Sequence, residues 1–223
     1  MTQTLLIAGA SRGIGLEMAR QAKARGDTVI AMLRSAASAQ ALEGIADQVL
    51  IAGVTDEAAL ENAAAELESD VDILVCNAGV YRGRGGIDAD DMGSDAWSET
   101  LMTNVAGPFF VTKAFLPRLK PSGKVVIVSS KMGSSARAPG GGYIYRSSKA
   151  AATNLACNLA AELKPKGIAV GSYHPGWVRT DMGGSAADIS AEESAAGLLS
   201  RFDALSLETT GVFEDYAGEE IPF

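Results

Sequence analysis

Short, wholly apolar runs alternate along the chain with longer segments in which apolar residues recur at helical spacing. The short runs contain too few polar positions for a half-exposed strand, so they predict strands buried on both faces. A final short run near the C-terminus predicts an edge strand. The predicted strands cover residues 4–8, 28–33, 49–52, 71–76, 124–129, 168–173 and 211–213.

The segments between the strands predict helices over residues 14–25, 56–67, 96–119, 145–163 and 191–205. Gly26 stands where a helix C-cap favours glycine, and Thr55 or Asp56 is suited to an N-cap. Pro108 lies within the longest predicted helix, so we expect a kink or distortion there.

Buried strands that alternate with helices are typical of a parallel sheet covered on both faces. The predicted fold class is therefore α/β, a single Rossmann-like, doubly wound domain over residues 1–223. In such a sheet the ligand is expected outside the carboxyl ends of the strands.

The balance of charged residues is acidic, with 27 Asp and Glu against 19 Lys and Arg and a formal net charge of −8. This charge disfavours nucleic acid and anionic membranes as partners. No targeting segment or long apolar span is evident, so we expect a cytoplasmic protein. The isolated Cys76 and Cys157 predict free, buried thiols in a reducing compartment, and with His174 as the only histidine we expect no metal site.

A glycine-rich loop joins the first predicted strand to the first helix. Gly9, Gly13 and Gly15 form a Gly-x-x-x-Gly-x-Gly pattern, which differs from the usual Gly-x-Gly-x-x-Gly fingerprint. Glycines allow the sharp turn and the close approach of a pyrophosphate to the helix N-terminus. In isolation the same glycines could serve only a turn, but their place between strand and helix favours a dinucleotide.

The end of the second predicted strand indicates which nicotinamide cofactor is used. An NAD site usually carries an acidic residue there, whereas this chain has Arg34, and Arg12 lies in the glycine loop. Two guanidinium groups could hold a 2′-phosphate, so we predict NADP(H) in preference to NAD(H). The alternative is that both arginines are solvated surface groups.

Tyr145 and Lys149 are four residues apart at the start of a predicted helix, so both face the same side. A neighbouring ammonium stabilises a phenolate, which would fit the tyrosine for proton transfer near neutral pH. Ser130 follows the fifth predicted strand, where a hydroxyl can donate to a carbonyl oxygen that gains negative charge. Each signal alone also has an ordinary structural explanation.

Together these motifs resemble the short-chain dehydrogenase/reductase family. Asn77-Ala78-Gly79, Asn104 and a Pro-Gly segment at Pro175-Gly176 occur with them in the family's order. The chain is most similar to the carbonyl-reductase-like subgroup that includes sniffer and the C-factor-like proteins, on the segment 143–149 and the ending 218–223.

The resemblance implies roles for the matching positions. Tyr145 would be the general acid in reduction, Lys149 would lower the pKa of Tyr145 and hold the nicotinamide ribose, Ser130 would polarise the carbonyl, and Asn104 would support a proton relay. Tyr143 is a weaker aromatic candidate near the substrate. The cofactor contacts would come from Gly9, Ser11, Arg12, Gly13, Ile14, Gly15, Arg34, Val54, Asn77, Ala78, Gly79, Tyr145, Lys149, Pro175, Gly176, Val178 and Thr180.

The chain departs from the family pattern at several positions. Cys76 replaces an asparagine before Asn77, and Gly53 stands where an Asp commonly contacts adenine, so we expect a weaker or backbone-only adenine contact. His174 precedes the Pro-Gly segment and is interpreted as structural or at the edge of the pocket.

The resemblance implies a carbonyl or alcohol as the small-molecule substrate and a homodimer or homotetramer that pairs through the long helices. The lid segment 181–190 is short and rich in small residues, which favours an open or mobile lid. The loop 82–86 could attract an anionic substrate, although such a loop is more often solvated. An NADP-binding regulator with vestigial catalysis is the alternative function, whereas a sugar-nucleotide epimerase would need a longer C-terminal region.

Overall fold

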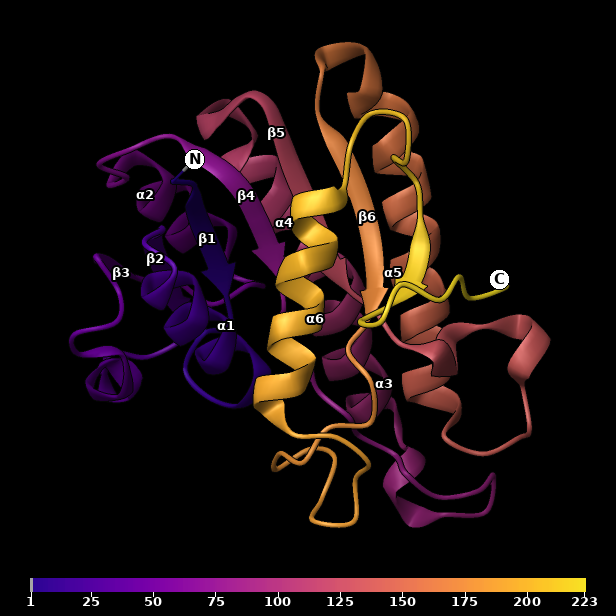
Figure 1. The fold of residues 1–223 in the computed structure, drawn as a ribbon. Coiled ribbons are helices and arrows are strands. Elements are labelled where there is room, and N and C mark those ends of the chain that lie inside the picture. The colour runs from indigo at the N-terminus through magenta and orange to yellow at the C-terminus, as the bar shows by residue number, and fades with distance from the viewer. Residues whose placement is uncertain (1) are drawn as a thin grey trace.

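The computed structural model describes residues 2–223 and contains a seven-stranded parallel sheet (Figure 1). The strand order is β3-β2-β1-β4-β5-β6-β7. The strands are β1 (Thr4–Ala8), β2 (Thr28–Leu33), β3 (Gln48–Ile51), β4 (Val71–Cys76), β5 (Leu119–Val128), β6 (Ala169–His174) and β7 (Phe213–Asp215). The helices are α1 (Gly13–Ala24), α2 (Glu57–Ala65), α3 (Ser94–Leu101), α4 (Gly107–Phe115), α5 (Tyr143–Leu163) and α6 (Ala191–Ala204).

Two hydrophobic clusters cover the two faces of the sheet. Along β1, Leu6 and Ala8 pack into one cluster, whereas Leu5 and Ile7 pack into the other, as the alternation of side chains along a strand requires. The first cluster includes buried residues of α2, α4 and α5, and the second includes those of α1 and α6 (Figure 1). The predicted doubly wound α/β fold is confirmed.

Strand β1 pairs with β2 on one side and with β4 on the other, so the direction of winding reverses there. Such a reversal leaves a crevice at the carboxyl ends of the strands, because the flanking connections leave on opposite faces. This edge of the sheet is where the predicted site residues cluster.

The predicted helix over residues 96–119 is interrupted. It consists of α3, a π-helical turn at Met102–Ala106, and α4. Pro108 has no N–H to donate to the carbonyl group of Asn104, four residues earlier, so the regular hydrogen-bond pattern is broken at this point. The expected distortion is confirmed, and it lies immediately before the proline.

Other element bounds differ more modestly. Strand β5 begins at Leu119, earlier than predicted, because it pairs with Val71 across a register shift. A 3₁₀ segment at Ala36–Leu42 was not expected. Gly26 has a φ of +93°, and Asp56 accepts a hydrogen bond from the Ala59 amide, as their predicted capping roles require.

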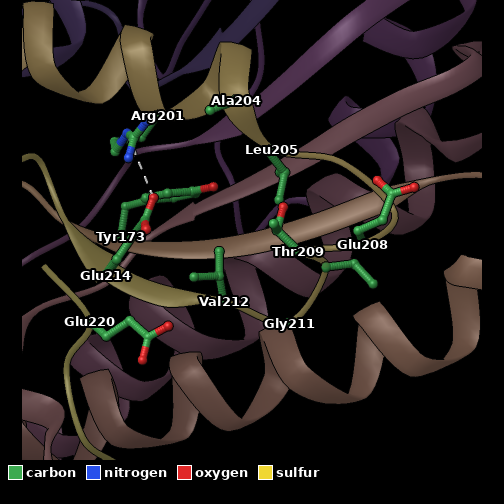
Figure 2. A pocket seen from close by; sticks show the side chains of 11 residues that line it. Tyr173, Arg201, Ala204, Leu205, Glu208, Thr209, Gly211, Val212, Glu214 and Glu220 are labelled. Atoms are coloured by element: carbon green, nitrogen blue, oxygen red, sulfur yellow. Dashed lines mark ion pairs between the residues drawn. The ribbon is translucent and has the colours of Figure 1, made fainter. Parts of the chain in front are cut away.

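The structure also contains a hollow of about 480 Å³ beside β6 and β7 (Figure 2). Arg201 and Glu214 lie in its wall as an ion pair of 3.8 Å, near the buried Tyr173. None of the predicted catalytic or cofactor residues lines this hollow, so it is separate from the candidate site. Within residues 2–223, no helix has the length and apolar character needed to cross a bilayer.

Candidate active site

The predicted site residues gather at the carboxyl edge of the sheet, although they come from most of the length of the chain. Gly9 follows β1, Arg34 follows β2, and Val54 follows β3. Asn77-Ala78-Gly79 follows β4, and Ser130 follows β5. The segment after β6 carries Pro175-Gly176, Val178 and Thr180. This placement follows from the parallel arrangement, in which all strands end at the same edge.

The glycine loop packs so closely that side chains are excluded at two of its positions. A Cβ at Gly9, whose φ is +89°, would lie 2.8 Å from the backbone of Ala78. A Cβ at Gly15 would lie 2.2 Å from the carbonyl oxygen of Gly9. Asn77 Nδ2 donates to that same oxygen at 2.8 Å. The loop after β1 and the Asn-Ala-Gly segment after β4 are therefore built as one unit.

The N-terminus of α1 is suited to an anion. Its N-cap residue, Arg12, makes no side-chain capping hydrogen bond, and its first turn contains no acidic residue. The first N–H groups of a helix have no intrahelical acceptor, and the helix dipole is positive at this end. Gly13 lies beside Thr180, because a Cβ at Gly13 would be 3.3 Å from Thr180 Cγ2. These groups fit the pyrophosphate of a dinucleotide and the part of the dinucleotide next to it on the nicotinamide side.

The two arginines predicted to hold a 2′-phosphate have different surroundings. Arg34 is exposed and forms no ion pair within 4.0 Å with any residue in the range 2–223. Arg12 is also exposed, but its Nη1 lies 2.6 Å from Asp181 Oδ2. Arg12 must therefore exchange this carboxylate for a phosphate if it is to bind the cofactor. A Cβ at Gly53 would lie 3.9 Å from the side chains of both Arg34 and Asp56. No neighbouring side chain therefore occupies the space beside this glycine.

Tyr145 and Lys149 lie on the first turns of α5 with their side chains buried. Lys149 Nζ is 5.6 Å from the centre of the Tyr145 ring, and it donates to the Val128 carbonyl oxygen at 2.7 Å. Ser130 caps the turn after β5 by accepting from the Met132 amide at 3.1 Å. The tyrosine and lysine, on α5, and the serine, after β5, are thus held around one place.

Burial dominates the electrostatics of this group. It raises the pKa of Tyr145 to about 12, although the Ser130 hydroxyl acts in the opposite direction. Burial also lowers the pKa of Lys149 to about 8. Burial of the phenol is the largest of these effects, and it outweighs the lowering of the Tyr145 pKa by the Ser130 hydroxyl and the Arg84 guanidinium. The phenol is protonated at neutral pH, as a general acid must be.

Asn104 links three segments around the site. Its side-chain amide donates to the Val80 carbonyl oxygen at 2.9 Å and to Ser148 Oγ at 3.0 Å, and its Oδ1 accepts from the Val80 amide at 2.9 Å. A Cβ at Gly79 would lie 3.3 Å from Asn104 Oδ1 and 3.6 Å from Lys149 Nζ. The π-helical turn directs this amide toward α5, so the distortion of the helix places Asn104 within hydrogen-bonding distance of Ser148.

Comparison with known proteins decides the family. Residues 3–190 match the model of the short chain dehydrogenase family. The chain belongs to this family.

Individual relatives agree with this assignment. The C-signal protein of Myxococcus xanthus is 41% identical over 159 residues, which cover 69% of this chain and 93% of that protein. Among solved structures, carbonyl reductase Sniffer of D. melanogaster has a TM-score of 0.93 at 28% identity, with 100% of both chains covered. A carbonyl reductase from chicken fatty liver, solved with NADPH bound, has a TM-score of 0.90 at 29% identity, with 100% of this chain and 99% of that chain covered. The chain is thus an oxidoreductase of the short-chain dehydrogenase type with a carbonyl-reductase-like structure.

The remaining positions of this dehydrogenase have mainly structural surroundings. His174 is buried, its two ring nitrogens have no hydrogen-bond partner among residues 2–223, and burial lowers its pKa to about 4, so its ring is uncharged at neutral pH. Cys76 is buried and lies 4.0 Å from Thr112 Oγ1, in agreement with the expected buried thiol. Cys157 is exposed, contrary to the expected pair of buried thiols, because it lies on the outer side of α5. Tyr143 is 39% exposed at the start of α5.

Two residues that contribute to this site, Ser148 and Tyr81, were not predicted from the sequence. Ser148 accepts from Asn104 and donates to the Tyr145 carbonyl oxygen at 2.8 Å. Its position three residues after Tyr145 puts it on the same helix face, so the helical spacing could have indicated it. Tyr81 stacks on Tyr145, and no local pattern in the loop after β4 indicates this contact.

Proposed function

We propose that this protein is an NADP(H)-dependent carbonyl reductase in which one domain holds both cofactor and substrate. The observation that carries the proposal is the convergence of Ser130, Tyr145 and Lys149 at the sheet edge, next to an uncapped helix N-terminus. The NADP- and NADPH-bound neighbours in the same family support the choice of cofactor. Arg34, which has no acidic partner within 4.0 Å among residues 2–223, supports it independently.

The residues present fit a nicotinamide dinucleotide. The α1 N-terminus and the glycine loop would hold the pyrophosphate, Arg34 and Arg12 the 2′-phosphate, and Thr180 the nicotinamide side. Lys149 would hold the nicotinamide ribose, and Gly79 beside Lys149 Nζ leaves room for it. When bound, the nicotinamide supplies a hydride for reduction or accepts one in oxidation.

Side chains of the protein would supply the proton for the reaction. The hydroxyl groups of Ser130 and Tyr145 would donate to the carbonyl oxygen of the substrate and stabilise its developing negative charge. Tyr145 would then transfer its proton to that oxygen, and the Lys149 ammonium would stabilise the phenolate that remains. The raised pKa of Tyr145 keeps the proton available before the reaction.

The test is titration of the protein with NADPH and with NADH, followed by loss of nicotinamide absorbance with a panel of aldehydes, ketones and quinones. We expect tighter binding of NADPH and turnover that Tyr145→Phe abolishes while NADPH binding persists. Equal or tighter binding of NADH would contradict the cofactor assignment, and turnover that survives in Tyr145→Phe would contradict the role of the tyrosine.

The similarity to C-signal favours a second candidate function, an NADP-binding regulator. Binding of NADPH without turnover of any carbonyl in the panel would support the regulator over the reductase.

We also propose that the protein forms a homodimer or homotetramer through the helices on one side of the sheet. Leu101, Met102 and Phe109 are 38–44% exposed on the run from α3 to α4, and a group of exposed apolar side chains on one run of helix favours an interaction surface. Light scattering should show an oligomer in the wild type and a smaller species in Phe109→Glu. A monomeric wild-type protein would contradict the proposal.

A further inference from the structure

The ring of the candidate acid, Tyr145, is part of a stack with the side chains of Tyr81 and Arg84. The rings of Tyr81 and Tyr145 lie nearly parallel, with centroids 4.2 Å apart and an interplanar angle of 21°. The guanidinium carbon of Arg84 is 4.5 Å from the centroid of the Tyr81 ring. Arg84 and Tyr145 cannot occupy the same face of Tyr81 at these distances, so Tyr81 lies between them. The order of groups is therefore the Arg84 guanidinium, the Tyr81 phenol and the Tyr145 phenol.

Arg84 and its neighbour Arg82 are held in different ways. Arg82 forms a bidentate pair with Glu99 through contacts of 2.9 and 3.0 Å, which neutralises its charge. Arg84 forms no ion pair within 4.0 Å in the part of the chain from residue 2 to residue 223. Its Nη2 instead donates to the Met182 carbonyl oxygen at 2.9 Å. The Arg84 guanidinium is thereby anchored over the aromatic face, where a cation is attracted by the ring, and the Asp91 carboxylate accepts from the Arg84 backbone amide at 3.0 Å.

Close packing fixes the loop that carries these two side chains. Gly83 is buried between the two exposed arginines and has a φ of +61°. A Cβ there would come within 2.6 Å of Ile144 Cδ1 and 2.7 Å of Met92 Sδ. On the other side, a Cβ at Gly142 would be 3.3 Å from the Tyr81 hydroxyl oxygen. The lack of a side chain at Gly83 and Gly142 therefore leaves the space in which the Tyr81 ring packs against the Tyr145 ring.

We propose that Tyr81 and Arg84 are positioning residues for Tyr145, and that Arg84 acts on its proton transfer through the stacked ring. This inference rests on the proposed reductase function for its catalytic consequence, but the effect on the phenol itself does not depend on turnover. The groups that face Tyr145 are Ser130 after β5, Lys149 on α5, and Tyr81 and Arg84 after β4.

The charges around Tyr145 give the direction of the effect. Burial raises the pKa of Tyr145 and Tyr81 adds to the rise, whereas Ser130 and Arg84 oppose it. Removal of the Arg84 charge should therefore make Tyr145 a weaker acid. Because the guanidinium is exposed and acts across one ring, we expect an upward shift of about 0.3–0.7 pH units.

The test compares Arg84→Gln, which removes the charge, with Arg84→Lys, which keeps it, and with Arg82→Gln as a control at a neutralised neighbour. The first measurement is NMR of protein labelled at the tyrosine ζ carbon, with the Tyr145 signal assigned from Tyr145→Phe. We follow the onset of its titration between about pH 8 and pH 11. We expect the onset to move to higher pH in Arg84→Gln, to return toward wild type in Arg84→Lys, and to stay unchanged in Arg82→Gln.

The second measurement is steady-state reduction of 4-nitrobenzaldehyde with NADPH. We expect kcat to fall about two- to fivefold in Arg84→Gln, with NADPH affinity unchanged and substantial recovery in Arg84→Lys. An NMR onset that is the same in Arg84→Gln and wild type would overturn the inference. If the NMR shift occurs but no variant turns over any carbonyl, the positioning of Tyr145 stands and the proposed reductase function fails.

Discussion

Replacement of Asn104 by alanine tests whether the π-helical turn, the loop after β4 and α5 are joined as the structure shows. Asn104 is 1% exposed and makes three hydrogen bonds to Val80 and Ser148. Each hydrogen bond contributes about 1 kcal/mol net, and groups left without a partner in a buried place cost more. Val80 is only half-buried, so water recovers part of the loss. We expect Asn104→Ala to lower the free energy of unfolding by about 3 kcal/mol.

For a domain of this size, a loss of 1 kcal/mol lowers Tm by about 2–4 °C, so the expected decrease is about 6–12 °C by calorimetry. Asn158→Ala is the matched control, because Asn158 is exposed on α5 and its amide donates to Asn154 in the previous turn. The control should stay within about 0.5 kcal/mol of wild type. An Asn104→Ala protein with the same Tm as the control would refute the assigned hydrogen bonds.

Three further predictions concern charge and backbone packing. The Lys149 ammonium loses its proton as pH rises through about 8, so kcat/KM for reduction should fall above that pH. A kcat/KM that does not change with pH in this range would contradict the role of Lys149 in stabilising the phenolate. Asp181→Asn releases Arg12 from a surface ion pair worth up to about 1 kcal/mol, so calorimetric titration should show up to about fivefold tighter NADPH binding with NADH unchanged. Gly15→Ala would place a Cβ 2.2 Å from a carbonyl oxygen of the same loop, so we expect lower Tm and loss of NADPH binding, whereas Gly86→Ala, with open space around it, should bind normally.

The local pattern of the sequence was sufficient for most of the fold. The predicted strands at residues 4–8, 28–33 and 71–76 coincide with β1, β2 and β4, because a run of apolar residues reports burial on both faces. Strand β5 was the main exception. Its first residues, 119–123, include lysine, proline, serine and glycine and do not form an apolar run, so only pairing with β4 across a register shift makes them a strand.

Part of the candidate site could likewise be predicted from the sequence, and part depended on the tertiary structure. The sequence alone determined the fold class, the edge at which the ligand is expected, and the set of Ser130, Tyr145 and Lys149, because motif order along a parallel sheet fixes which residues meet. Only the tertiary structure decided that Arg12 pairs with Asp181 and that Tyr81 covers Tyr145. These contacts join segments far apart in the chain, and they depend on how loops pack against one another. Periodicity and spacing report burial and local geometry, and they carry no information about such packing.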